Sequence, residues 1–479
     1  MNSKRSKKAD TSNRNRSTES HVGSWPLFWT ILLWVVLALA VFTVLGWLWG
    51  EGPSWSWQRW LTNWRSAGAD AGPLEVVKVS LTTIGGIGGT GYLVIKYRER
   101  ASAERAEKAA ELARKDIEQE KAEQKLLNAV QQLGSESPQV RIAGVYALAD
   151  VADTYRGGYR QRVVNILCGY LRTPRGAWET ITGTTAADGE TASEKVYVSN
   201  DGAVESTVLE VLSRHLRKRR EKTDTHDAVI QDVSEDQLWC DCTIDLHDAV
   251  ITESLNFTDV TLASDMSFQG ATFNTFAIFQ GASFDAHVTF RGATFNADTS
   301  FSKATFKDGT RFWEATFNAN THFEHATFNA NTSFSDATFK ANTYFWGATF
   351  ADTSFSKATF NANTQFEHAT FEASTYFWEA TFNADTSFWD ATFNAKTSFS
   401  KATFNADTSF SKATFNADTS FSEATFNRAA PPTGIPPKLV DHETGLPKGA
   451  RWARFKDKSE VIEEGSPEPD KPSDAAGSS

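Results

Sequence analysis

Cys240, Cys242 and His247 are the residues whose types and spacing come closest to a metal site in this 479-residue sequence. Thiolates and an imidazole are ligands that Zn²⁺ prefers, and these three could supply most of one coordination shell. A structural zinc site usually draws its cysteines from two separated pairs, however, and the sequence has only one C-x-C here. We therefore expect buried thiols, with no metal and no cofactor.

Residues 86–91, Gly-Ile-Gly-Gly-Thr-Gly, match the G-x-G-x-x-G pattern of dinucleotide-binding loops. Such a loop joins a strand to a helix inside a βαβ unit, and the second strand of that unit is missing. Close helix packing through Gly85-x-x-x-Gly89 explains these glycines better. Because no Ser/His/Asp, Cys/His or paired-carboxylate arrangement stands out from the periodicity of the sequence, we expect a protein that is not an enzyme.

Length and composition limit the class of protein before any element is assigned. A chain of 479 residues allows about three domains. Its net charge of −11 argues against a general nucleic-acid binder, and its three cysteines argue against a disulfide-built secreted protein. No nucleic-acid partner is expected.

Two apolar runs predict a transmembrane hairpin over residues 24–97. The first run, 27–49, has no charged residue, and the uncharged part of the second, 79–95, lies at the lower limit of length for a crossing. Basic residues dominate the arm 1–23, which we expect to be disordered, and basic residues also follow the second run. The positive-inside rule then predicts a two-span plasma-membrane protein with both termini in the cytoplasm and membrane lipid as a partner.

Helices should follow this hairpin. Residues 98–134, rich in Ala, Glu, Lys and Arg, predict a long juxtamembrane helix. Residues 135–225 predict a small all-α segment, with a Gly/Thr/Ser-rich loop over about 173–200 and a last helix over about 203–221. The end of that helix is densely basic. Two interpretations remain open: the positive charges interact favourably with the dipole at the helix C-terminus, or they contact anionic lipid headgroups. The basic residues there are Arg214, Arg217, Lys218, Arg219 and Arg220.

A period of eleven residues begins at Leu246 and runs to Phe426 in alternating steps of five and six. It has 34 large apolar centres, and 31 of the 35 Phe of the chain occupy them; one residue is omitted between Phe350 and Phe355. Thr, Ser and Asn between the centres disfavour a helix. In short strands, the centre and the Ala or Thr two residues before it would both point inward.

Units such as 386–390, Thr-Ser-Phe-Trp-Asp, and 391–395, Ala-Thr-Phe-Asn-Ala, resemble those of the bacterial pentapeptide-repeat family. The layout of most of residues 25–455 also resembles that of membrane-anchored members of the family. The resemblance implies a right-handed, four-sided β-helix over 240–427 without enzymatic activity, with four units in each of about eight coils. The expected fold is thus mixed: a two-helix transmembrane hairpin, a small all-α segment and a pentapeptide-repeat solenoid. Residues 428–479 should form a cap and a disordered tail.

The outward positions vary most beside every second Phe, where aromatic and acidic residues collect. Positions four units apart should stack, which groups Glu324, Trp346, Glu367 and Trp389 on one face. An exposed aromatic and acidic ladder of this kind predicts a surface that binds a protein partner. The alternative is neutral variation on a tolerant surface. Two Glu-His pairs in this ladder lie two coils apart, and that separation of about 10 Å is too large for a shared metal. The ladder consists of Trp313, Glu324, Tyr344, Trp346, Glu367, Tyr376, Trp378 and Trp389.

The leading functional hypothesis is a membrane-tethered, non-enzymatic scaffold that presents the rod to an unidentified protein on the cytoplasmic side. The alternative, implied by DNA-mimicking relatives in the family, is an acidic regulator of a DNA-binding enzyme such as a topoisomerase. Residues 246–426 contain 19 acidic and 9 basic residues, a net charge of −10. A DNA duplex about 40 Å long carries about 24 charges, so this acidity is sparse for a mimic.

Overall fold

The computed structural model describes residues 32–33, 35–37, 39–40, 73–182, 193–221, 230–232 and 237–453. It divides into two compact units, Met1–Gln119 and Glu120–Ser479, each of which is described by itself. Helix α3 (Pro73–Leu133) contributes to both units and ends where Gly134 N donates to Val130 O at 3.0 Å.

The predicted transmembrane hairpin is wrong, and so is the two-span plasma-membrane location inferred from it. No helix among the described residues has an apolar stretch long enough to cross a bilayer. In α3 the uncharged stretch 79–95 contains five Gly, three Thr and one Ser, which dilute its hydropathy, and charged residues flank it closely. Of the first apolar run, only residues 32–33, 35–37 and 39–40 are described, and the arm 1–23 lies outside the described residues.

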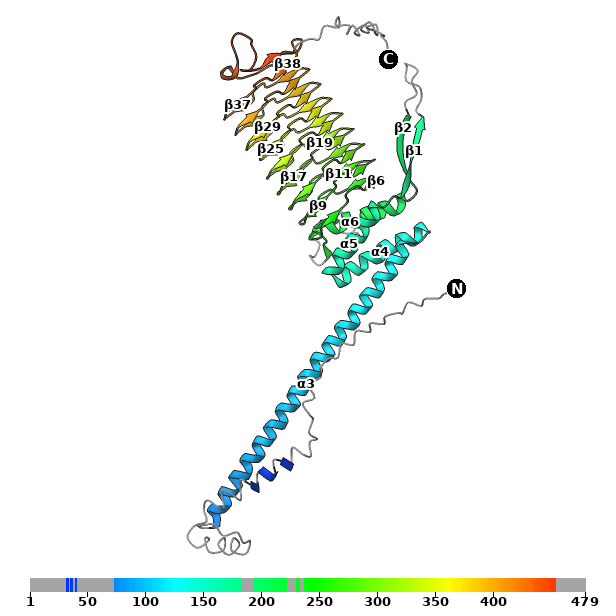
Figure 1. Cartoon of the computed structure of the whole chain (residues 1–479), viewed down its shortest axis with the longest axis vertical. Coiled ribbons are helices and arrows are strands. Elements are labelled where there is room, and N and C mark those ends of the chain that lie inside the picture. The colour runs from blue at the N-terminus through cyan, green and yellow to red at the C-terminus, as the bar shows by residue number, and fades with distance from the viewer. Residues whose placement is uncertain are drawn as a thin grey trace, which may run out of the picture. The chain divides into compact units, whose positions relative to one another are not determined.

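Three helices form the core of the all-α part of the second unit (Figure 1). They are α4 (Pro138–Tyr155), α5 (Gly158–Arg172) and α6 (Gly202–Leu216). Their apolar faces meet in one fully buried cluster with the end of α3, and this cluster continues into the core of the repeat. The helices therefore close one end of the repeat.

Two β-hairpins differ from the secondary structure expected between and after these helices. Strands β1 (Gly176–Thr182) and β2 (Ser193–Ser199) pair antiparallel within the segment expected to be a loop. Cross-strand packing of Trp178 against Tyr197, with ring centroids 5.3 Å apart, stabilises this pair, and only pairing of the two segments creates that contact. The last helix ends at Leu216, and β3 (Arg219–Glu221) pairs with β4 (Ile230–Asp232).

The repeat forms a rod of very short parallel strands, from β5 (Ile244–Asp245) to β38 (Thr425–Phe426) (Figure 1). Each strand has two residues and pairs with the strand four places further along the chain, as Thr294 does with Thr316. Each coil therefore contains four strands and normally two of the eleven-residue periods, which confirms the predicted four-unit coil. The omitted residue shortens one coil by a single position, because Thr332 pairs with Thr353, and the pairing continues in register on both sides.

Four sheets enclose the rod, and each is named here by its first and last strand in the chain. The β6–β39 sheet has ten strands, the β5–β37 sheet nine, and the β7–β35 and β8–β36 sheets eight each. The rod thus slightly exceeds the eight coils expected. Since consecutive strands pass from one side to the next, the β5–β37 and β7–β35 sheets lie on opposite sides, as do the other two.

Phenylalanine rings fill the rod in stacks. Phe366 is fully buried and lies nearly parallel to Phe345 and Phe388, with centroids 4.7 and 4.9 Å away. The Thr two residues before alternate centres also point inward, as predicted, and each hydroxyl donates to a nearby carbonyl: Thr364 Oγ1, for example, donates to Ala362 O at 3.2 Å. These inward Thr therefore leave no donor unsatisfied.

Both ends of the rod are covered. At the far end, β39 (Arg451–Trp452) adds to β38, Thr433 pairs with Ser409, and Lys438 Nζ donates to Phe415 O at 2.7 Å. Such a cap hides strand edges that would otherwise template association. The expected tail beyond residue 453 lies outside the described residues.

Candidate functional site

The eight ladder residues lie in two columns on opposite sides of the rod. Tyr344 lies in a strand of the β7–β35 sheet, and four other residues each follow a strand of that sheet by two positions. We call these five the first column: Glu324, Tyr344, Trp346, Glu367 and Trp389. The second column consists of Trp313, Tyr376 and Trp378, which flank strands of the β5–β37 sheet. One partner surface therefore cannot include all eight residues.

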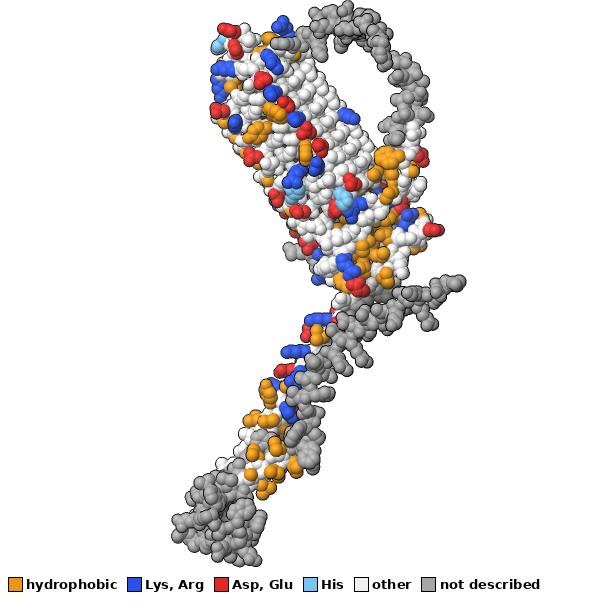
Figure 2. Space-filling model, viewed as in Figure 1, with side chains coloured by type: hydrophobic (Ala, Val, Ile, Leu, Met, Phe, Trp, Pro, Cys, Tyr) orange, Lys and Arg blue, Asp and Glu red, His pale blue; other side chains and the backbone are white. Residues whose placement is uncertain are grey.

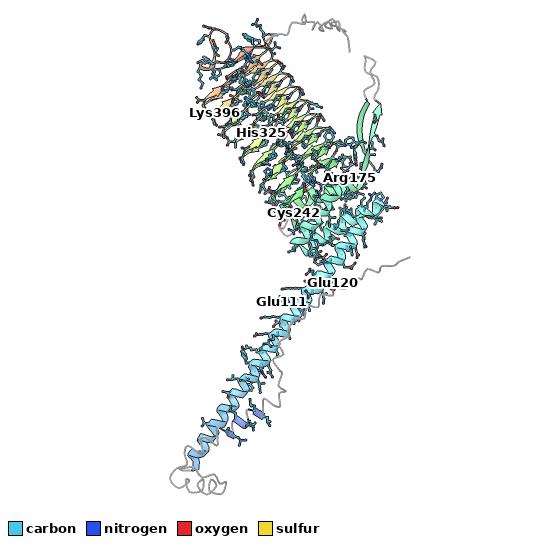
Figure 3. All side chains as sticks on the ribbon, viewed as in Figure 1. Glu111, Glu120, Arg175, Cys242, His325 and Lys396 are labelled. Atoms are coloured by element: carbon cyan, nitrogen blue, oxygen red, sulfur yellow. The ribbon has the colours of Figure 1, made fainter. Side chains whose placement is uncertain are left out.

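Histidine and tryptophan rings alternate along the first column. Trp346 lies between His325 and His368, with centroid distances of 4.5 and 5.7 Å and nearly perpendicular rings. His368 also meets Trp389 edge-on at 4.7 Å, and Lys412 Nζ lies 4.6 Å from the centroid of that indole. Figure 3 shows His325 on the outside of the rod. Contacts on both sides hold these indoles in place, although Trp346 remains 39% exposed.

The two Glu-His pairs are evident in the sequence, but the alternation of their histidine rings with tryptophan rings was not predicted. The signal was present, since His325 precedes Trp346, and His368 precedes Trp389, by one position less than a full coil. That offset places each histidine at the corner of the coil next to the indole. His325 and His368 have φ of 56° and 57°, and this left-handed corner conformation aims their rings along the column.

A smaller polar cluster lies beside the column. Glu324 accepts hydrogen bonds from Ser302 Oγ at 2.7 Å and from His322 Nδ1 at 2.8 Å, and the His322 ring stacks on Tyr344 at 4.9 Å. The hydrogen bond to Glu324 raises the pKa of His322 above its usual 6.5, although burial opposes it. Burial by itself would raise the pKa of Glu324, but the hydrogen bonds from His322 and Ser302 lower it below 4.5.

These pKa shifts predict a pH window for the pair. A raised pKa means that His322 stabilises the fold fully below pH 6.5, and this contribution is lost as pH rises through the folded-state pKa. A lowered pKa means that Glu324 stabilises the fold above pH 4.5, and this contribution is lost as pH falls through its folded-state pKa. The pair therefore contributes fully to the stability of the fold only between about pH 4.5 and 6.5.

In an NMR titration of the full chain, Glu324→Gln should lower the pKa of His322, because the variant loses the carboxylate that stabilises the imidazolium. An unchanged pKa would contradict the pairing.

Cations lie over both indoles of the second column. Lys357 and Lys401 lie 5.4 and 5.7 Å from the centroid of Trp378, and the guanidinium of Arg291 lies 4.1 Å from that of Trp313. Cation–π contacts of this kind stabilise the surface of the rod itself. Two coils that present Ser335 and Ser356 separate the two indoles, so this column is not continuous.

A shallow groove of about 420 Å³ crosses the β7–β35 sheet near the capped end. Glu367, Asp385 and Asp407 contribute carboxylates to it, and Pro431 and Thr433 form one wall. Among the described residues, none of these three carboxylates makes a salt bridge with a basic side chain. The groove continues the first column with a polar, acidic surface.

The cysteine segment has the character of a protein interior. Cys168, Cys240 and Cys242 are buried, and burial raises the pKa of Cys168 and of Cys242 to about 12. These two thiols are therefore protonated near neutral pH and are poor metal ligands or nucleophiles. His247 binds Asp245 instead, at 2.7 Å, and no group of three metal-ligating side chains occurs within the described ranges.

The glycine motif lies inside α3, without the strand and loop that a phosphate site requires. A Cβ added at Gly85 or Gly89 would meet nothing within 4 Å, so no helix packs there among the described residues. The dinucleotide site therefore has no structural support.

The basic cluster does not line one helix face. Helix α6 ends at Leu216, after which Arg217 donates to Thr258 O at 2.8 Å and Arg219 Nε lies 3.1 Å from Asp232 Oδ1. Burial lowers the pKa of Arg217. Arg214 and Lys218 are exposed, and lipid headgroup contact by the cluster stays a prediction.

The four-sided stack of parallel strands defines a β-solenoid repeat protein. Residues 279–327, 312–359, 345–392 and 388–431 match the family model described as pentapeptide repeats (9 copies). The rod is therefore a pentapeptide-repeat solenoid, consistent with a non-enzymatic repeat protein. No curated protein and no solved structure matches the chain.

Proposed function

We propose that this protein is a non-enzymatic scaffold that binds a protein partner through the first column. The observation that supports this most strongly is its continuity: Glu324, Trp346, Glu367 and Trp389 follow one another on four successive coils. Figure 2 shows that coloured side chains gather in bands along the rod, with largely white surface beside them. A partner would find its chemically distinctive contacts concentrated in such bands.

The rigidity of the column also supports binding. Interfaces lose affinity when flexible side chains must be ordered, and the indoles of Trp346 and Trp389 are already held between neighbouring rings and cations. Half-exposed Trp residues in fixed positions are typical binding hot spots. The second column is a weaker candidate because two coils that present Ser335 and Ser356 interrupt it.

No specific observation favours the DNA-mimic alternative. Basic residues interrupt the acidic surface of the rod, and three of them pair with carboxylates: Arg291 with Glu314, Lys307 with Asp285 and Lys401 with Glu379. A duplex mimic needs a continuous run of negative charge along its length.

The proposal predicts that changing both Trp346 and Trp389 to alanine abolishes crosslinking to the partner. The full chain, carrying a photocrosslinker at Glu367 on the same column, would be compared with the double variant by mass spectrometry. The matched control changes Trp313 and Trp378 to alanine, which removes two indoles from the opposite side and should leave the crosslinked protein unchanged. If the same protein crosslinks equally to all three chains, the first column is not the binding surface.

A further inference from the structure

The β6–β39 sheet has an outer surface that differs from both ladder columns, and we call it the Thr–Asn face. On eight successive coils a strand presents an outward Thr, and seven of them present an outward Asn two residues later. Lys340 replaces Asn in the remaining coil. The pairs are Thr272/Asn274, Thr294/Asn296, Thr316/Asn318, Thr338/Lys340, Thr359/Asn361, Thr381/Asn383, Thr403/Asn405 and Thr425/Asn427.

Hydrogen bonds between coils fix the asparagine side chains. Asn296 Nδ2 donates to Asn274 Oδ1 at 2.8 Å, and Asn318 Nδ2 donates to Asn296 Oδ1 at 2.7 Å. The same ladder joins Asn405 to Asn383 at 2.8 Å. The amides therefore form rigid rows, with their orientation set along the rod.

The threonine side chains form a second row beside the amides. The parallel pairing of Thr294 with Thr316 and of Thr381 with Thr403 holds them in register, and each is half-buried. Within the described residues, the only hydrogen bond between hydroxyls of this row joins Thr425 to Thr403, at 3.2 Å. Most of the row can thus present methyl and hydroxyl groups to water at a constant spacing.

This spacing resembles that of crystalline water. Successive coils are about 4.8 Å apart, and residues i and i+2 of a strand are about 6.6 Å apart. Tetrahedral water with O···O distances of about 2.75 Å has second neighbours about 4.5 Å apart and a layer repeat of about 7.3 Å. The repeat distances of the Thr–Asn face and the corresponding distances of the ice lattice differ by about a tenth or less, both along the rod and across it. We propose that the Thr–Asn face binds the surface of ice.

The opposite side of the rod provides an internal comparison. Six of the eight strands of the β8–β36 sheet are also Thr-Phe, but Asp285, Lys307 and Glu372 occupy positions equivalent to Asn. A charged side chain orders water around itself and interrupts a regular water layer. At these positions the Thr–Asn face has one charged residue, Lys340, whereas the β8–β36 sheet has three.

The test is partition of the full-length protein into slowly growing ice, with thermal hysteresis measured in parallel. The wild type should be enriched in the ice fraction. Changing Thr316 and Thr381 to lysine should abolish the enrichment, because it replaces two outward Thr of the row with long charged side chains and leaves no run of more than two uninterrupted coils beside Lys340. The matched control changes Thr327 and Thr392 to lysine on the opposite sheet and should leave the enrichment intact.

Exclusion of the wild type from ice, or an equal loss in both double variants, would overturn the proposal. Circular dichroism checks that each variant keeps its β-structure. If the lysine variants unfold, Thr316→Ser and Thr327→Ser repeat the comparison by removing only a methyl group, and loss of ice partition in the first alone supports the same conclusion. The first column is unchanged in every variant, so this test is independent of partner binding.

Discussion

Changing Phe366 to alanine is expected to lower the free energy of unfolding of the rod by about 3–5 kcal/mol. The ring is fully buried near the middle of the rod and contacts six other rings. It stacks on Phe345 and Phe388 and meets Phe355 and Phe377 edge-on at 5.6 and 5.7 Å. Alanine would leave a cavity bounded by these rings, and the strands on either side are too short and too constrained by their ladders to close it. Urea unfolding followed by circular dichroism measures the loss.

Leucine at the same position is the matched control. It keeps most of the buried volume and should cost markedly less than alanine, since large apolar replacements that conserve volume cost less than about 1.5 kcal/mol. In a solenoid, stability depends on contacts between neighbouring coils, so a cavity in the middle should also permit partial unfolding from one end. Equal stability of the alanine variant and the wild type would contradict a rod held together by its ring stacks.

Changing Glu205 to alanine is expected to destabilise the junction between the helices and the rod by about 3–5 kcal/mol. Glu205 in α6 is completely buried; it accepts hydrogen bonds from Arg175 Nη2 at 3.0 Å and from Thr252 N at 2.6 Å. Arg175 is 4% exposed at its side chain and also donates to Val250 O at 2.7 Å. Figure 3 shows Arg175 where the helices meet the rod. Without Glu205, a buried guanidinium and two backbone donors of the first coil would lose their acceptor.

Glu210 provides the control for this prediction, because it lies on the same helix and is exposed. Glu210→Ala should change stability little, as exposed substitutions usually do. Thermal unfolding of Glu205→Ala should show the helical part melting first, and hydrogen exchange should locate the lost protection in α6 and the first coil. A melting curve for Glu205→Ala that coincides with that of Glu210→Ala would show that the buried pair does not join the two parts.

The repeat could be predicted from the sequence because its determinants are local. A large apolar residue at every fifth or sixth position, with Ala or Thr two residues before it, allows one alternation of inward and outward side chains. Phe366 and Thr364 are both buried as this pattern requires. The predicted membrane hairpin is wrong because residues 79–95, although uncharged, contain glycine and threonine, which lower the hydropathy of this stretch.

The arrangement of the candidate site depended on the closed coil. The sequence by itself determined the rod, its inward rings and the candidate ladder, since each follows from the order of neighbouring residues. Only the tertiary structure decided that Trp346 and Trp378 lie on opposite sides, that His368 lies against two indoles, and that Glu205 meets Arg175. The physical reason is that four sides must close before residues a full coil apart in the sequence become neighbours, so these contacts depend on the whole coil.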